Sequence, residues 1–360
     1  MSQAIAAHLP FSRRRGIYTG DGAALFAATA IAVMIAAALL AGAVPISFSI
    51  VTVFLFAGPH NWVEFRYFLS KMPAHWGPLR GFFVTAIVGV VGLSALFAAI
   101  PFIGQAGHWN AEMWGMASAV WNSLLLIWIA TLAVMRGRQL NSSARRSRVT
   151  QPGANANAAG KWAWAIPVAL ALIALVWMVP QAWDVGLVYL HPLVALVFLD
   201  RELGRRKPQW RWAWRGCMAC LPMALGILWW RLADSAPLAG QDMLTMRITR
   251  HAGADFLSGV SSHLLVSTHT FLEMLHYGVW LVAMPLIALR AAPWKLQSVP
   301  LARRSRPWRG GVIAIVALGG LAVIALWGCF LGNYAATRDV YFTLAIAHVL
   351  AEVPFLLRTF

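Results

Sequence analysis

Three histidine–glutamate pairs lie in otherwise apolar stretches of this chain. In each pair the glutamate follows the histidine by four residues, which places both side chains on one face of a helix, one turn apart. The pairs are His60 with Glu64 in PHNWVE, His269 with Glu273 in HTFLEMLH, and His348 with Glu352 in HVLAEV. Ionisable groups are costly in apolar surroundings, so each pair is expected to have a partner or a chemical role.

Two further histidines extend this pattern. His276 lies three residues after Glu273, so three successive turns of one helix would present His, Glu and His. Glu-x-x-His is a spacing by which di-iron bundle proteins supply metal ligands. His191 lies in a fourth apolar stretch, in YLHPLV.

Together these side chains predict a metal centre. Imidazole and carboxylate donors suit iron, zinc or manganese, and thiolates are lacking at these positions. We expect iron as Fe²⁺, one or two ions, ahead of zinc or manganese. The glutamates are either further ligands or acceptors that fix the histidine tautomers. The candidate metal ligands are His60, His191, His269, His276 and His348, and either of these two roles is open to Glu64, Glu273 and Glu352.

The composition predicts that the bilayer is the solvent for most of the chain. Of the 360 residues, 60% are hydrophobic and 11% are charged, and the mean hydropathy is +0.67. A soluble domain could not bury so much apolar surface. The net charge of +17 comes from Lys and Arg in short clusters between apolar runs, which is typical of membrane topology and not of a nucleic-acid-binding face.

The apolar runs predict an all-α, polytopic integral membrane protein with about ten transmembrane helices in a single transmembrane domain, 1–360. Each run has roughly the 17 to 25 residues that are needed to cross about 30 Å of hydrocarbon. The expected spans are 22–46, 47–70, 80–103, 111–135, 161–180, 182–201, 213–231, 262–289, 310–332 and 337–357.

The distribution of basic residues predicts the orientation of these spans. With the N-terminus inside, all but four of the 29 Lys and Arg fall in inside segments; the exceptions are Arg231, Arg247, Arg250 and Arg338. This asymmetry follows the positive-inside rule and predicts that both termini are cytoplasmic, in a bacterial-type inner (plasma) membrane. Residues 136–160 are expected to form a flexible basic cytoplasmic loop, and 232–261 an outer loop or amphipathic segment.

The predicted topology also predicts that the histidines converge. All five candidate ligands fall on even-numbered spans that run from outside to inside. They lie about 7 to 14 residues from the outer ends, on the order of 10 to 21 Å deep. Four helices could thus bring imidazoles to a similar depth. Hydrogen-bonding core histidines, paired haem ligands and a proton or ion path built from His and Glu stay open as alternatives.

The stretch PHNWVE at 59–64 resembles the Pro-His-x-x-x-acid motif of the bacterial and archaeal membrane dioxygenases that cleave β-carotene to retinal, the Brp/Blh type. The resemblance covers this motif and the general layout of intramembrane histidines. It implies a polytopic helical fold in which histidines from different spans bind ferrous iron. It would make His60, His191, His269 and either His276 or His348 the iron ligands. Glu64 would then support a ligand without binding the iron itself.

These patterns predict a membrane non-haem iron oxygenase that acts on a lipophilic substrate from the bilayer, with carotenoid cleavage as the specific expectation. The metal would bind dioxygen at an open coordination position. A metal-dependent membrane hydroxylase or desaturase is the alternative among enzymes, and a haem-binding or ion-coupled transport protein the alternative among non-enzymes. The expected partners are the bilayer and the lipophilic substrate, without nucleic acid; the sequence leaves a redox partner undefined.

Overall fold

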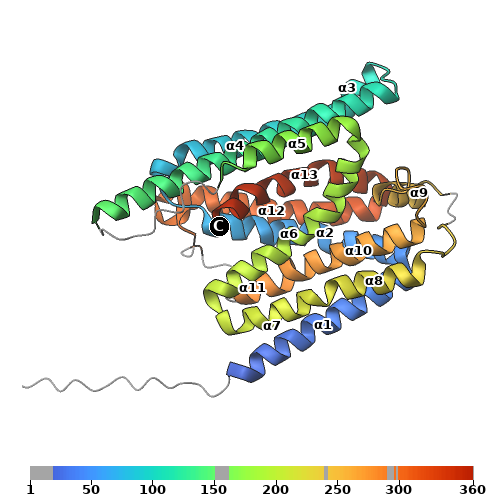
Figure 1. Cartoon of the computed structure of the whole chain (residues 1–360), viewed down its shortest axis with the longest axis horizontal. Helices are drawn as coiled ribbons and strands as arrows, with labels where there is room; N and C mark the ends of the chain where they lie inside the picture. The colour runs from blue at the N-terminus through green and yellow to red at the C-terminus, as the bar shows by residue number, and fades with distance from the viewer. Residues whose placement is uncertain (1–18, 151–161, 239–241, 290–295, 297–298, 360) are drawn as a thin grey trace, which may run out of the picture.

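The structure, a computed structural model, describes residues 19–150, 162–238, 242–289, 296 and 299–359. Every regular element in these residues is helical, which confirms the all-α fold class (Figure 1). The α-helices are α1 (Thr19–Ala43), α2 (Pro45–Lys71), α3 (Arg80–Ala106), α4 (Ala111–Thr150), α5 (Ala165–Met178), α6 (Pro180–Arg206), α7 (Pro208–Ala219), α8 (Leu221–Leu232), α9 (Met243–His251), α10 (Ser262–Gly278), α11 (Met284–Ile287), α12 (Arg306–Gly332) and α13 (Tyr334–Thr359). A π-helical segment, Val279–Ala283, joins α10 to α11.

Eight helical segments within the described residues are long and apolar enough to cross a membrane, so the chain has the character of a multi-pass membrane protein. They correspond to α1, α2, α3, α4, α6, α10 with its continuation to Ile287, α12 and α13. Two of the ten expected spans differ from this pattern. They are 161–180 and 213–231.

Each of the two differing segments has a local cause. α5 has 14 residues, about 21 Å of helix, because the backbone leaves helical geometry at Val179 and Pro180 begins α6. The segment 208–232 is divided into α7 and α8 at Cys220. Pro222 lacks the N–H that a continuous helix would need at that position, which explains the break.

The expected flexible loop 136–160 is helical over its first part. α4 continues to Thr150, because its Arg, Gln, Leu and Ala residues favour a helix and no proline interrupts it before Pro152. Residues 151–160 lie outside the described residues. The expected outer segment 232–261 contains α9, whose buried Ile248 packs against Leu265 and Val266 of α10.

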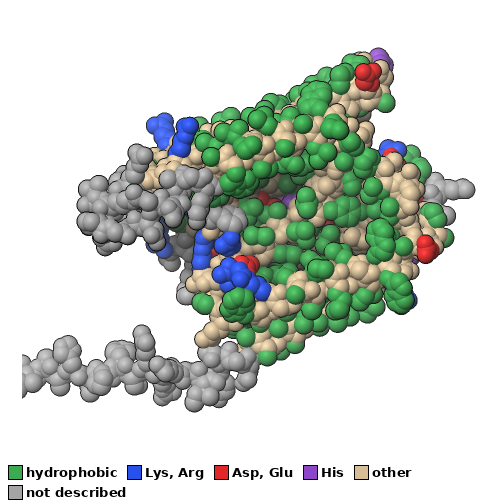
Figure 2. Space-filling view, in the orientation of Figure 1, with side chains coloured by type: hydrophobic (Ala, Val, Ile, Leu, Met, Phe, Trp, Pro, Cys, Tyr) green, Lys and Arg blue, Asp and Glu red, His purple; other side chains and the backbone are tan. Residues whose placement is uncertain are grey.

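The helices that carry the candidate ligands lie in the middle of the molecule. In Figure 1, α3, α4 and α5 form one layer, while α1, α7 and α8 lie on the opposite side. Between them α10 contacts α2 and α6, and α13 contacts α2, α3 and α6. The outer helices turn large apolar side chains outward, among them Leu39, Val88 and Leu318, and Figure 2 shows this apolar surface. Such a surface fits lipid as solvent.

A buried carboxylate holds α2 and α6 together at one end of the bundle. Glu202 is 1% exposed and lies 2.6 Å from Nζ of Lys71, 3.2 Å from Nη1 of Arg205 and 3.0 Å from Nε of Arg206. The hydroxyl of Tyr67 donates to the same carboxylate at 3.0 Å. Four donors thus satisfy one buried charge, as burial of a carboxylate requires.

Close packing of α3 on α4 depends on a glycine. The indole Nε1 of Trp128 donates to the carbonyl of Thr85 at 3.0 Å, which lays the ring across Gly89. A Cβ at Gly89 would overlap that ring. Gly89→Ala is therefore expected to lower the free energy of unfolding by about 2 kcal/mol, measured by reversible unfolding in mixed micelles.

Gly92→Ala on the same helix is the control, because nothing lies within 4 Å of a Cβ built at Gly92. It should leave stability unchanged or raise it slightly, since alanine favours a helix over glycine. Equal stability of the two variants would contradict this packing of α3 on α4.

Candidate metal centre

Four helices bring their polar side chains to one place in the middle of the bundle. α2 supplies His60 and Glu64, α6 supplies His191, α10 supplies His276, and α13 supplies His348 and Glu352. Each helix has a proline or a π-helical segment close to these residues. Pro59 precedes His60, Pro192 follows His191, Pro354 follows Glu352 by two residues, and the π-helical segment begins three residues after His276. Prolines and π segments bend helices and are frequent at functional sites.

Three imidazoles and one carboxylate form the centre of this site. One donor atom each from His60, Glu64, His276 and His348 lie within 4.8 Å of one another. We call these four residues the His–Glu group. Ligands on opposite sides of one first-row metal ion lie about 4 Å apart, so a small inward shift of the side chains would close the group on an ion.

The imidazole of His60 is oriented by its own helix. Its Nδ1 lies 2.9 Å from the carbonyl oxygen of Phe56 and donates to it in the Nδ1–H tautomer. This leaves Nε2 with a free lone pair, and among the described residues nothing hydrogen-bonds to that atom. A histidine whose Nδ1–H is held by a backbone carbonyl is the usual arrangement of a metal-binding imidazole.

Glu64 and His276 are buried, and the described residues offer no hydrogen-bond partner to either side chain. Both carboxylate oxygens of Glu64, and both ring nitrogens of His276, lack a partner in the part of the chain that the structure describes. Glu64 is 0% exposed and His276 is 2% exposed. Unpaired buried polar groups are costly, and a buried carboxylate is more costly still. A bound cation would satisfy both.

His191 connects this group to a second carboxylate. Its Nε2 lies 3.1 Å from Nε2 of His348, and its Nδ1 lies 3.1 Å from Oε2 of Glu352. Two nitrogens bound side by side to one ion at about 2.1 Å would lie about 3.0 to 3.4 Å apart, so the His191–His348 distance fits shared coordination. Glu352 is placed to hold the tautomer of His191.

His269 and Glu273 are not brought into the His–Glu group. On α10, His269 lies two turns and Glu273 one turn before His276, so His269 is about 10 Å from His276 along the helix axis. There they form a second polar cluster with His251 of α9: Nδ1 of His269 is 3.7 Å from Oε2 of Glu273, and the rings of His269 and His251 are 5.1 Å apart. The sequence spacing alone could not separate these two levels of one helix.

His251 is a member of this second polar cluster that sequence reasoning did not select. Its ring is half-buried beside His269, and its centroid lies 4.3 Å from that of the Phe342 ring. Burial, with His269 and Arg338 nearby, holds the pKa of His251 well below its usual value, so the imidazole is neutral. The sequence does contain a helix-start residue for α9, because Asp242 is an N-cap whose carboxylate accepts from the backbone N–H of Thr245. Ile248 follows at a buried position of the same helix.

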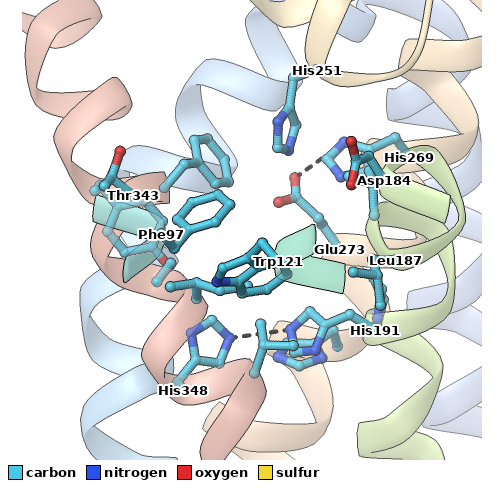
Figure 3. A pocket seen from close by; sticks show the side chains of 18 of the residues that line it. Phe97, Trp121, Asp184, Leu187, His191, His251, His269, Glu273, Thr343 and His348 are labelled. Carbon is cyan, nitrogen blue, oxygen red and sulfur yellow. Dashed lines mark hydrogen bonds and ion pairs between the residues drawn. The ribbon is translucent and has the colours of Figure 1, made fainter. Parts of the chain in front are cut away.

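A cavity of about 490 Å³ joins the two clusters. In Figure 3, His251, His269 and Glu273 lie toward one end and His191 and His348 toward the other, with Trp121 and Leu187 between them. The remaining wall is mostly apolar. It is formed by Phe97, Ile100 and Pro101 of α3, Trp114 of α4, Val188 of α6, and Phe342, Ile346 and Val349 of α13.

The cavity opens toward one face of the molecule. Figure 2 shows a hollow in the apolar surface, with histidine and acidic side chains visible at its base. The rim carries Asp184, which accepts hydrogen bonds from Ser118 and Asn122 at 2.8 Å each. An apolar cavity of this size with a few convergent polar groups is typical of a small-molecule site.

Comparison of this chain with family models, with curated proteins and with solved structures found no match.

Proposed function

We propose that this protein is an integral-membrane, non-haem iron oxygenase that acts on a lipophilic substrate. The observation that carries the proposal is the His–Glu group, in which the buried side chains of His60, Glu64 and His276 and the half-buried imidazole of His348 converge from three helices. The free Nε2 of His60 and the unpartnered oxygens of Glu64 support it, because they are the donors that a metal would satisfy.

The same donors favour iron as the metal. Imidazole and carboxylate ligands with open positions are characteristic of non-haem iron oxygenases. His60, Glu64, His276 and His348 would hold one ion, and His191 with Glu352 would bind it as well or hold a second ion. Iron in this position would supply the binding and activation of dioxygen. The surrounding residues fix the ligands, exclude water and hold the substrate.

The apolar cavity favours a substrate from the bilayer. Its wall includes the aromatic side chains of Phe97, Trp114, Trp121 and Phe342, which we call the aromatic wall, between the His–Glu group and the second polar cluster. Its opening lies in the apolar surface. Carotenoid or apocarotenoid cleavage is the specific reaction we propose, in line with the resemblance of PHNWVE to the membrane carotene dioxygenases. Cleavage of a double bond by dioxygen into two carbonyl groups needs no external reductant. Hydroxylation or desaturation would need an electron donor.

The packing of the imidazoles argues against haem. Two axial ligands on opposite sides of a haem iron are about 4 Å apart and have the porphyrin between them. The Nε2 atoms of His191 and His348 are 3.1 Å apart, and the rings of His60 and His348 are centred 5.2 Å apart. This spacing suits ligands that share one side of a small ion.

We also propose that the chain crosses a bacterial inner membrane ten times, with both termini cytoplasmic. The short helix α5 and the divided pair α7 and α8 would make the two crossings beyond the eight long apolar segments. The concentration of Lys and Arg on one side supports this orientation.

A bulky residue in the cavity tests the proposal without changing a ligand. Leu187 lines the cavity beside Trp121, and Leu187→Trp should fill the space next to His191. We expect at least a tenfold loss of dioxygen uptake with polyene substrates in lipid nanodiscs, while bound iron is retained, because only substrate positioning is blocked.

Leu190→Trp is the matched control. Leu190 lies on the same helix but is 57% exposed and faces outward. It should retain dioxygen uptake close to that of the unmodified protein. Equal uptake by both variants, or the absence of any polyene-dependent uptake by the iron-loaded protein, would contradict the proposed function.

A further inference from the structure

The second polar cluster has a carboxylate on the cavity wall with one weakly satisfied oxygen, because Oε2 of Glu273 is 3.7 Å from Nδ1 of His269, which is longer than a hydrogen bond. Glu273 lines the cavity, is 7% exposed, and its Oε2 has no hydrogen-bond partner among the described residues. Its other oxygen accepts a long hydrogen bond of 3.4 Å from the hydroxyl of Tyr277. A buried carboxylate oxygen that faces an apolar cavity is costly unless a ligand supplies a donor.

The groups around Glu273 could complete the recognition of a hydroxyl group. His269 and His251 also line the cavity, and a neutral imidazole can donate from one nitrogen and accept at the other. A hydroxyl group both donates and accepts, so it could donate to Glu273 while it accepts from an imidazole N–H.

The charge balance of the cluster favours an uncharged ligand group. The guanidinium of Arg338 is 4% exposed and lies 4.6 Å from the ring centroid of Phe342, which lines the same cavity as Glu273. One cation and one carboxylate thus offset each other. A ligand carboxylate or ammonium group would leave the buried cluster with an uncompensated charge, whereas a hydroxyl group adds no net charge to it.

We infer that the second polar cluster binds the hydroxyl group of a lipophilic substrate, whose apolar chain or ring system lies along the aromatic wall toward the His–Glu group. This inference rests on the proposed function and defines its substrate class. Because the two clusters are about 10 Å apart along α10, the bound hydroxyl would select which carbon of the chain reaches the metal.

The test measures binding alone, with the full-length protein in lipid nanodiscs and without added metal. The probes are a C18 alcohol with a conjugated tetraene and the methyl ether of that alcohol. Trp114 and Trp121 line the cavity, so energy transfer from tryptophan to the tetraene reports occupancy. The alcohol should bind roughly tenfold or more tightly than the ether, because the ether cannot donate to Glu273.

Two variants test whether the second polar cluster is the part of the protein that recognises the hydroxyl group. Glu273→Gln should reduce the preference for the alcohol to about threefold or less, because the acceptor loses its charge. His251→Gln should reduce it as well, and it keeps the test valid if Glu273→Gln does not fold. His75→Gln is the matched control, because His75 is exposed and does not line the cavity, and it should keep the full preference.

The outcomes separate this inference from the proposed function. Equal affinity for the alcohol and the ether would overturn the inference, as would a preference that survives loss of both Glu273 and His251. A preference that depends on these residues in a protein that binds no iron would support hydroxyl recognition and refute the oxygenase.

Discussion

Replacement of His276 by alanine is expected to reduce the affinity for iron more than 100-fold, so the purified variant should hold less than a tenth of the iron of the unmodified protein. His276 is buried in the His–Glu group and neither ring nitrogen has a hydrogen-bond partner within the described residues. Loss of a residue that hydrogen-bonds to a metal ligand already lowers metal affinity roughly 10- to 100-fold. Loss of a ligand itself should therefore lower the affinity more. Inductively coupled plasma analysis measures the effect.

Two histidine variants serve as controls for this prediction. His75 is exposed and lies outside the site, so His75→Ala should keep the full iron content. His269→Ala should also keep most of it, because the structure places His269 in the second polar cluster. Iron lost equally from His269→Ala and His276→Ala would contradict the separation of the two clusters.

Replacement of Glu202 by alanine is expected to lower the free energy of unfolding by about 3 kcal/mol. Removal of one partner from a buried ion pair commonly costs 3 to 5 kcal/mol. Lys71, Arg205 and Arg206 keep side-chain exposures of 26%, 47% and 32%, so they can regain water and the lower value applies. Reversible unfolding in mixed micelles would measure the loss.

Asp255 offers a comparison with an exposed ion pair. It lies 2.7 Å from Arg250, but their side chains are 64% and 74% exposed. Asp255→Ala should change stability by less than about 1 kcal/mol, because water screens such pairs. A Glu202→Ala variant as stable as Asp255→Ala would show that the Glu202 network does not hold α2 to α6.

The convergence of four histidines could be predicted because it depends on few properties of the sequence. His60, His191, His276 and His348 lie on segments that the predicted topology makes parallel, at a similar predicted depth. The period of a helix then determines which residues share a face. In the structure these four rings lie close together, and their role as metal ligands stays a prediction.

Other features depend on tertiary packing and local backbone geometry that the sequence pattern does not encode. His269 precedes a glutamate by four residues, as His60 does. Its distance from the His–Glu group nevertheless depends on how α10 packs on α2. His251 of the second polar cluster is the last residue of α9, a nine-residue helix between expected spans. So short a helix has too little apolar periodicity to predict which of its residues face the protein interior. The division at Cys220 follows from Pro222, which hydropathy averaging over a long window conceals.

The metal content of the unmodified protein tests the central claim most directly. The full chain, purified from iron-supplied cells and held in lipid nanodiscs, should contain about one or two irons per chain, without Soret absorption. X-ray absorption at the iron edge should give nitrogen and oxygen neighbours at about 2.0 to 2.2 Å, as imidazole and carboxylate ligands require. A protein without bound metal, or one with a Soret band, would contradict the account.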